Sequence, residues 1–105
     1  MDVSIIIVNY NTCDLLKQCI QSIITNTREV VYEIIVIDND SHDESCQMLK
    51  NDFPTVKLIR SNINLGFGKA NNLGIKQASG KYLFFLNSDT IFCKFGQEMT
   101  HDGST

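Results

Sequence analysis

Residues 3–11 read Val-Ser-Ile-Ile-Ile-Val-Asn-Tyr-Asn, an apolar run that ends abruptly in a polar group. The β-branched side chains of this run favour a strand. Because the run does not alternate between apolar and polar residues, we expect the strand to be buried on both faces. Such strands occur in parallel sheets that are covered by helices. The segment therefore predicts an α/β fold.

The same alternation of apolar run and amphipathic segment continues along the chain. Apolar strands are predicted at residues 3–8, 33–37, 56–59 and 81–86. Apolar residues at helical spacing fill the intervals, at residues 15–24, 46–53 and 67–78. Right-handed crossovers between parallel strands then predict a doubly wound, mostly parallel sheet with helices on both faces.

Local signals mark the ends of these helices. Asn11 or Thr12 can cap the first helix. The run from Ser41 to Glu44 fits the S-x-x-E capping box at the start of the second helix. Pro54 ends the second helix. Gly80 is expected as a left-handed cap after the third helix.

Composition excludes several classes of protein. The chain has 105 residues, of which 43% are hydrophobic, and a net charge of −3. It is therefore one small domain or half of a larger one, and its acidity argues against a nucleic-acid partner. No apolar run approaches the roughly 20 residues of a membrane helix, and the first four residues lack the basic start of a secretory signal. We expect a cytoplasmic protein, with peripheral association at the inner face of the membrane left open.

The four cysteines suggest neither a metal site nor a disulfide framework. They contain no C-x-x-C pair and no histidine lies near two of them, which leaves zinc and thioredoxin-type sites without support. We expect four reduced thiols, at Cys13, Cys19, Cys46 and Cys93.

Polar clusters follow three of the predicted strands, at residues 9–11, 38–40 and 87–89, and residues 61–64 follow the remaining strand. Asn and Asp favour turns and helix caps, which is the simpler explanation. It accounts less well for Tyr10 and for the repetition at the same end of every strand. Ligands of open parallel sheets bind outside the carboxyl ends of the strands, so these clusters predict a binding site.

Three known sites of this topology do not match. Residues 9–11 contain no glycine, unlike the dinucleotide loop after the first strand. Residues 66–71 lack the third glycine of that loop, and residues 74–81 have the wrong spacing for a P-loop, with Tyr82 in place of its Ser or Thr. A receiver domain needs an Asp after the third strand, where this chain has Arg60, Ser61 and Asn62.

One arrangement remains, the N-x-D sequence formed by Asn87 and Asp89. Oxygen ligands at a sheet edge can hold Mg²⁺ or Mn²⁺ against a diphosphate, because these hard ions prefer oxygen. Asp38 can accept hydrogen bonds from a base or a ribose, and Tyr10 offers a ring for base stacking.

These motifs, from about residue 3 to residue 90, resemble the N-terminal half of family 2 glycosyltransferases, inverting nucleotide-sugar enzymes with the GT-A fold. Within that family the chain looks most similar to the rhamnosyltransferase-like branch. Residues 3–11 resemble the opening strand and its nucleotide-contacting turn, and residues 35–43 resemble the V-D-N-x-S-x-D segment. Residues 64–74 resemble the N-x-G-F-x-x-x-x-N-x-G helix, and residues 86–90 resemble the D-x-D site with Asn as its first residue.

The resemblance implies a strand order of 3-2-1-4 and the transfer of a sugar from a UDP- or dTDP-linked donor to an acceptor hydroxyl, in bacterial surface polysaccharide synthesis. It implies a metal cofactor, Mn²⁺ or Mg²⁺, with an acceptor glycan or lipid-linked saccharide as partner. The implied metal ligands are Asp89 and Asn87. The implied nucleotide-binding residues are Asn9, Tyr10, Asn11, Asp38, Asn39, Asn64, Gly66 and Lys69.

The resemblance covers residues 1–90 as a donor-binding half of a GT-A domain, and residues 91–105 form an atypical tail. In the family the general base lies in the second half, so we name no catalytic residue and expect this chain to be inactive alone. A non-catalytic nucleotide-binding or interaction module of the same topology is the alternative.

The predicted strand order also bears on assembly. It places residues 81–86 at an edge of the sheet, with an apolar run and no proline. An uncovered edge presents unpaired backbone groups to other chains. We therefore expect a homo-oligomer through this edge, unless residues 91–99 fold back as a short helix and seal it.

Overall fold

The computed structural model describes residues 1–88, 90–94 and 97–100, the last two ranges as backbone only. Strands and helices alternate over the first 87 residues, as the apolar pattern predicts, and two short strands follow. The elements are β1 (Val3–Asn9), α1 (Cys13–Asn26), β2 (Tyr32–Asn39), α2 (Ser45–Asp52), β3 (Lys57–Ser61), α3 (Gly66–Gln77), β4 (Tyr82–Asn87), β5 (Thr90–Lys94) and β6 (Gln97–Thr100).

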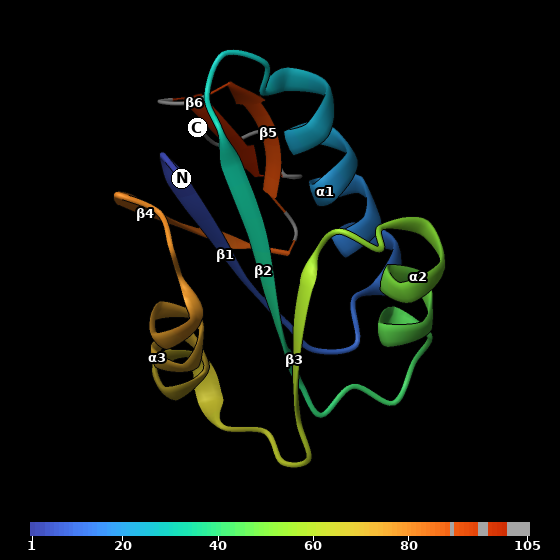
Figure 1. The fold of residues 1–105 in the computed structure, drawn as a ribbon. Helices are drawn as coiled ribbons and strands as arrows, with labels where there is room; N and C mark the ends of the chain where they lie inside the picture. The colour runs from blue at the N-terminus through green and yellow to red at the C-terminus, as the bar shows by residue number, and fades with distance from the viewer. Residues whose placement is uncertain (89, 95–96, 101–105) are drawn as a thin grey trace.

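The first four strands form one parallel sheet in the order β3-β2-β1-β4, which confirms the predicted order (Figure 1). β1 pairs with β2 over its whole length, from Val3 opposite Tyr32 to Asn9 opposite Asp38. β4 pairs with the other edge of β1. Because all four strands are parallel, their carboxyl ends meet at one edge of the sheet.

Helices cover both faces of this sheet, α1 and α2 on one face and α3 on the other (Figure 1). The consecutive isoleucines of β1 serve both layers, because successive side chains of a strand point to opposite faces. Ile5 and Ile7 pack with Leu16 and Ile20 of α1. Ile6 packs on the α3 side with Ile35, Ile37 and Ala70. The doubly wound fold predicted from these unbroken apolar strands is confirmed.

β5 and β6 form a separate two-stranded antiparallel sheet. β5 lies beside α1, and neither strand pairs with the four-stranded sheet in the part of the chain that the structure describes. The alternative of a short helix within residues 91–99 is therefore wrong for the two described strands. No helix among the described residues is long and apolar enough to span a membrane.

Two predicted helix signals are wrong. α2 begins at Ser45 rather than directly after Ser41, and its N-cap residue, Glu44, makes no side-chain cap hydrogen bond. The Ser41 hydroxyl instead accepts a hydrogen bond from the backbone N–H of Asn11, so the capping box does not form. Gly80 does not adopt a positive φ, and α3 ends at Ala78 in an extended conformation. Glycine is required there because a Cβ on Gly80 would lie 2.4 Å from the backbone nitrogen of Ser4.

A buried carboxylate fastens the amino-terminal side of the sheet. The Glu33 side chain is 8% exposed and pairs with the Lys57 ammonium at 2.8 Å. It also accepts hydrogen bonds from the Ser4 hydroxyl at 2.5 Å and from the Ser79 N–H at 2.6 Å. Burial would raise the pKa of Glu33, but these bonds and the Lys57 charge outweigh it and lower the pKa to about 2. The ionised form therefore joins β1, β2, β3 and the connection between α3 and β4.

This shift sets an acid dependence of stability. The pKa falls from 4.5 to about 2 on folding, which corresponds to about 3 kcal/mol of stability. Because the folded pKa is the lower one, this contribution is complete above pH 4.5 and is lost as the pH falls towards 2. We expect Glu33→Gln to lose most of it at pH 7 and to show a flatter dependence between pH 5 and 2. Urea unfolding across this range measures both effects.

The matched control is Glu29→Gln, which removes the same charge from an exposed side chain. It should leave the stability at pH 7 unchanged within about 0.5 kcal/mol. An acid dependence equally steep in Glu33→Gln and in the parent protein would contradict the role assigned to Glu33.

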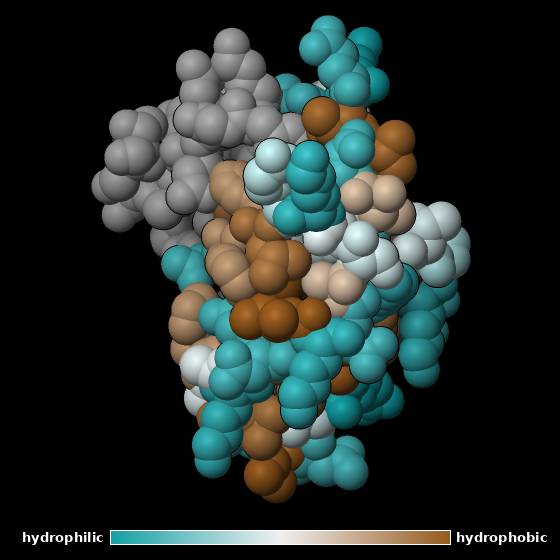
Figure 2. Space-filling view, turned by 60° about the vertical axis from the view of Figure 1, so that its left-hand side comes forward, coloured by the Kyte–Doolittle hydropathy of each residue, from teal (hydrophilic) through white to brown (hydrophobic). Residues whose placement is uncertain are grey.

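β4 forms an edge of the four-stranded sheet and carries exposed apolar side chains. Leu83 and Phe85 are 41% and 42% exposed, and Tyr82 is 64% exposed. Figure 2 brings the β4 and α3 side of the molecule forward and shows apolar surface gathered in the middle of this face. The outer edge of β4, unpaired with any other described strand, offers backbone groups for pairing with a further strand.

We expect the 105-residue protein to self-associate through this edge. Phe85→Lys places a charge on a half-exposed side chain of β4 and should shift the protein to monomer in sedimentation velocity across a concentration series. Phe67→Lys, on α3 at 55% exposure, is the control and should leave the distribution unchanged. A monomer at the highest concentration in the parent protein would rule out this assembly.

Candidate functional site

The carboxyl ends of β1, β2 and β4 bring three polar clusters to one edge of the sheet, as the sequence predicts. Asn9 lies opposite Asp38 in the parallel register, and Val8 lies opposite Asn87. Residues far apart along the chain therefore become neighbours at this edge.

Asn9 and Asp38 form the buried base of the site. Asn9 is fully buried and Asp38 is 1% exposed. The Asn9 Nδ2 donates to Asp38 Oδ1 at 3.1 Å and to the Ser41 hydroxyl at 3.3 Å. The other carboxylate oxygen of Asp38 accepts a bond from the Ser41 N–H at 3.0 Å. Both residues thus hold the turn after β2 in place.

The turns after β1 and β2 are locked together in conformations that most residues avoid. Asn11 has a φ of 52° and Asp40 a φ of 68°, in the left-handed region where Asn and Asp are enriched. The Asn11 N–H donates to the Ser41 hydroxyl, and Asn11 Oδ1 accepts from the His42 N–H at 2.7 Å. The Asp40 carboxylate lies 3.6 Å from the His42 ring.

Asn39 joins the end of β2 to the start of α3. It is 3% exposed. Its Oδ1 accepts from the Leu65 N–H at 2.7 Å and its Nδ2 donates to the Gly66 carbonyl. The exposed Asn64 accepts from the Gly66 N–H, and Gly66 has a φ of 78°, which suits glycine. Lys69 is exposed in the first turn of α3.

The remaining predicted residues divide into described and undescribed ones. Tyr10 is 47% exposed, with its ring available to a ligand, and Asn87 is exposed at the end of β4. Asp89 lies outside the described residues. Among the described residues no group of three acidic, histidine or cysteine side chains is placed to hold a metal ion. Asn87 carries an amide oxygen, the type of ligand that Mg²⁺ and Mn²⁺ prefer.

Three hydroxyls that sequence reasoning did not assign to the site belong to it. The Ser41 hydroxyl, in the turn after β2, accepts hydrogen bonds from Asn9 and Asn11 at the end of β1. Thr12 donates to Asn9 Oδ1 at 2.6 Å and lies 2.8 Å from the Ser88 hydroxyl. Each of the three follows a strand end within three residues, and that position is the signal that could have found them.

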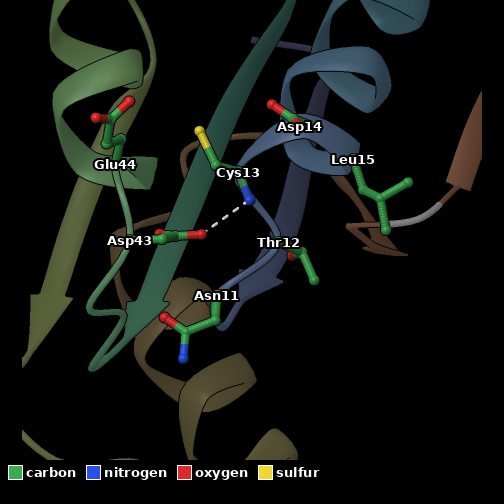
Figure 3. Close-up of a pocket in the computed structure, with 7 residues that line it drawn as sticks. All are labelled: Asn11, Thr12, Cys13, Asp14, Leu15, Asp43 and Glu44. Atoms are coloured by element: carbon green, nitrogen blue, oxygen red, sulfur yellow. Dashed lines mark hydrogen bonds between the residues drawn. The ribbon is translucent and has the colours of Figure 1, made fainter.

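An open hollow of about 450 Å³ lies beside this edge, between the start of α1 and the segment before α2 (Figure 3). It is lined by Asn11, Thr12, Cys13, Asp14, Leu15, Asp43 and Glu44. Asp43 accepts a bond from the Cys13 N–H at 3.1 Å (Figure 3). Burial would raise the pKa of Asp43, but hydrogen bonds from Ser45 and from this N–H outweigh it and lower the pKa.

The same hollow disfavours an anionic ligand and a reactive thiol. Burial, together with the charges of Asp43, Asp14 and Glu44, raises the pKa of the Cys13 thiol. The thiol is therefore protonated at neutral pH, and a diphosphate would meet three carboxylates.

The family model for glycosyl transferase family 2 matches residues 4–94. The chain belongs to this family. The resemblance found in the sequence motifs is thereby confirmed, and the fold of this family 2 chain is that of the GT-A glycosyltransferases.

Curated relatives of this family 2 chain are glycosyltransferases. It is 37% identical over 94 residues to the poly(ribitol-phosphate) beta-glucosyltransferase of Bacillus spizizenii, covering 85% of this chain and 15% of that protein. It is 38% identical over 89 residues to the glycosyltransferase YibD of Escherichia coli, covering 82% of this chain and 25% of that protein. The chain thus spans a quarter or less of the length of these two relatives.

Solved structures of the same fold include TarS of S. aureus, residues 1–349, in complex with UDP-GlcNAc. The TM-score is 0.76 at 26% identity, over 86% of this chain and 27% of that one. The mannosyltransferase PcManGT of Pyrobaculum calidifontis, in complex with GDP-Man and Mn²⁺, has a TM-score of 0.76 at 20% identity, over 86% of this chain and 28% of that one. The second likeness concerns the fold.

The hydrogen bonds of the buried Asp38 in this family 2 chain can be tested by substitution. Both of its carboxylate oxygens accept bonds from N–H donors. Asp38→Asn would turn one of them into an NH₂ group facing a donor, which leaves buried groups unsatisfied and costs about 1–3 kcal/mol. We expect this loss in urea unfolding at pH 7.

Asp40→Asn is the matched control, two positions along the chain. Its side chain is 35% exposed and its φ is 68°, a conformation in which Asn is well tolerated. Its stability should stay within about 0.5 kcal/mol of the parent protein. Equal effects of the two substitutions would show that the bonds of Asp38 are not the cause.

Proposed function

We propose that this chain is the donor-binding part of a glycosyltransferase that moves a sugar from a UDP- or dTDP-linked donor to an acceptor hydroxyl in bacterial surface polysaccharide synthesis. The observation that carries the proposal is the convergence of Tyr10, Asp38 and Asn87 at the carboxyl edge of a GT-A sheet. A cytoplasmic location, with peripheral association at the inner face of the membrane, is part of the proposal.

The relatives support the class of donor and acceptor. TarS, at 26% identity, is known in complexes with UDP and with UDP-GlcNAc. The relative from Bacillus spizizenii is named as a glucosyltransferase of poly(ribitol-phosphate), a polyol phosphate polymer. We infer an acceptor of similar chemistry, a hydroxyl on a glycan or a lipid-linked saccharide. The rhamnosyl donor suggested by the sequence branch is one candidate for the sugar.

Residue exposure assigns the proposed roles at the nucleoside end. Tyr10, at 47% exposure, would stack on the base. Asp38 is 1% exposed with both oxygens already accepting bonds. A bond from the base or ribose would therefore use a second lone pair of one of these oxygens. Asn9, Asn11 and Asn39 would hold the turns that surround the base.

The diphosphate would lie towards the end of β4. Gly66, Lys69 and Asn64 are exposed at the start of α3, which Asn39 joins to the end of β2, and they would line the nucleotide on that side. Asn87 and Asp89 would hold Mn²⁺ or Mg²⁺, which as a Lewis acid neutralises charge on the departing diphosphate. No acidic side chain among the described residues is assigned as the general base.

Calorimetry with UDP, dTDP and GDP, each with and without Mn²⁺, tests the proposal. We expect weak binding that strengthens with Mn²⁺. Tyr10→Ala should weaken nucleotide binding about tenfold through lost stacking, whereas Asp89→Ala should remove the gain from Mn²⁺ and leave the metal-free affinity unchanged. Tyr82→Ala is the control, because Tyr82 is an exposed tyrosine at the start of β4, at the opposite end of the strand from Asn87.

We expect no sugar transfer by this chain alone, because no general base is assigned in it. General-base catalysis contributes roughly 10²–10⁴-fold to the reaction rate. Slow hydrolysis of the donor is the most it should show. Binding without any gain from Mn²⁺ would favour a non-catalytic nucleotide-binding module instead. No binding to any of the three nucleotides would contradict the donor-binding role itself.

A further inference from the structure

Four side chains connect the ends of β2, β1 and β4 in a continuous line of hydrogen bonds. The line runs from Asp38 to Asn9 at 3.1 Å, from Asn9 to Thr12 at 2.6 Å and from Thr12 to Ser88 at 2.8 Å. We call these four residues the Asp38–Ser88 relay. Its last step joins residues 76 positions apart in the sequence.

Proton counting fixes the direction of every bond in this relay. Both carboxylate oxygens of Asp38 accept from N–H donors, so the NH₂ group of Asn9 faces Asp38. The Oδ1 of Asn9 then faces Thr12, whose single hydroxyl proton is donated to it. Thr12 has no second proton, so the Ser88 hydroxyl donates to Thr12. The bond between Asp38 and Asn9 thus orients a hydroxyl on the far side of β1.

Thr12 stands at a position where a threonine side chain usually caps the helix, but here its hydroxyl takes part in the relay. It is the N-cap residue of α1, yet its side chain makes no cap hydrogen bond. An N-cap threonine ordinarily stabilises a helix by accepting a hydrogen bond from an N–H of the first turn. The Thr12 hydroxyl bonds Asn9 and Ser88, and the N–H of the next residue, Cys13, donates to Asp43.

Ser88 has few other ties. It follows the last residue of β4, an edge strand that pairs only with β1 in the four-stranded sheet. Thr12 is its one side-chain hydrogen-bond partner among the described residues. The Cys19 thiol lies 3.9 Å from the carbonyl of the preceding residue, Asn87, which is a long contact. Among the side-chain hydrogen bonds of the described residues, Thr12 is therefore what ties Ser88 to the start of α1.

We propose that Thr12 is a positioning residue: through the Asp38–Ser88 relay it holds the diphosphate end of the donor site, at Asn87 and Ser88, in register with the nucleoside end, at Asp38. This inference rests on the proposed function for its meaning, while the positioning itself concerns side chains of this chain alone. It predicts that loss of the Thr12 hydroxyl uncouples the metal-dependent part of nucleotide binding from the metal-free part.

Thr12→Val is the test variant, because it keeps the shape of the side chain and removes the hydroxyl. Thr12→Ser restores the hydroxyl. The matched control is Thr27→Val at the other end of α1, where the buried threonine Oγ1 has no hydrogen-bond partner among the described residues. Thermal unfolding of all three variants shows that they are folded before binding is compared.

Amide hydrogen exchange of residues 87 and 88, measured without nucleotide, tests the positioning. We expect it to speed up about tenfold in Thr12→Val, as a local opening becomes easier. Thr12→Ser and Thr27→Val should exchange like the parent protein. Unchanged exchange in Thr12→Val would overturn the proposal.

Calorimetry with UDP then measures the ratio of the dissociation constants without and with Mn²⁺. We expect Thr12→Val to lower this ratio about tenfold while the metal-free constant stays within twofold, and Thr12→Ser to restore it. If both constants weaken together, or if neither changes, the role of Thr12 is structural and the proposal is wrong. Should the parent protein bind no UDP, the proposed function fails, whereas exchange at residues 87 and 88 still decides whether Thr12 holds Ser88.

Discussion

Burial of β1 on both faces and along both edges is the constraint on which the rest of the structure depends. Ile5, Ile6 and Ile7 are fully buried, with helices above and below and a parallel strand on either side. At roughly 1.5–3 kcal/mol for each buried aliphatic side chain, this strand is among the largest sources of stability in a chain of this size. Because β1 is held in this way, its polar end, from Asn9 to Asn11, is fixed at the carboxyl edge of the sheet.

The carboxyl edge of the sheet contains two sets of polar residues, one buried and one exposed. Asn9 and Asn39 are buried and use both ends of their amides on neighbouring turns. Tyr10 and Asn87 are exposed. The buried residues determine where the exposed ones stand, which is the arrangement expected of a site that is organised before its ligand arrives.

The two buried acids of β2 illustrate how environment separates function from stability. Glu33, at the amino-terminal side, faces the Lys57 ammonium and the Ser4 hydroxyl and ties four elements together. Asp38, five residues later at the carboxyl edge, accepts hydrogen bonds from the uncharged Asn9 amide and the Ser41 N–H. Glu33 forms an ion pair with Lys57 at the amino-terminal side of the sheet. Asp38 orients a line of dipoles that reaches the end of β4.

The sequence by itself determined the order of elements, the parallel sheet and the polar edge. Helical and strand spacing are local, so unbroken runs such as residues 3–8 and 33–37 specify buried strands whatever lies beyond them. The strand order 3-2-1-4 and the family came from whole motifs that resemble those of family 2 glycosyltransferases. The tertiary structure decided which polar groups meet. Ser41 fits a capping box over four residues, but it bonds Asn9 and Asn11 because β1 lies beside β2. Gly80 looks like a helix cap, but it is glycine because Ser4 approaches its backbone. Thr12 and Ser88 carry no local sign of their contact. Hydrogen bonds between residues 30 to 76 positions apart depend on strand register and helix packing, and no short stretch of sequence contains that information.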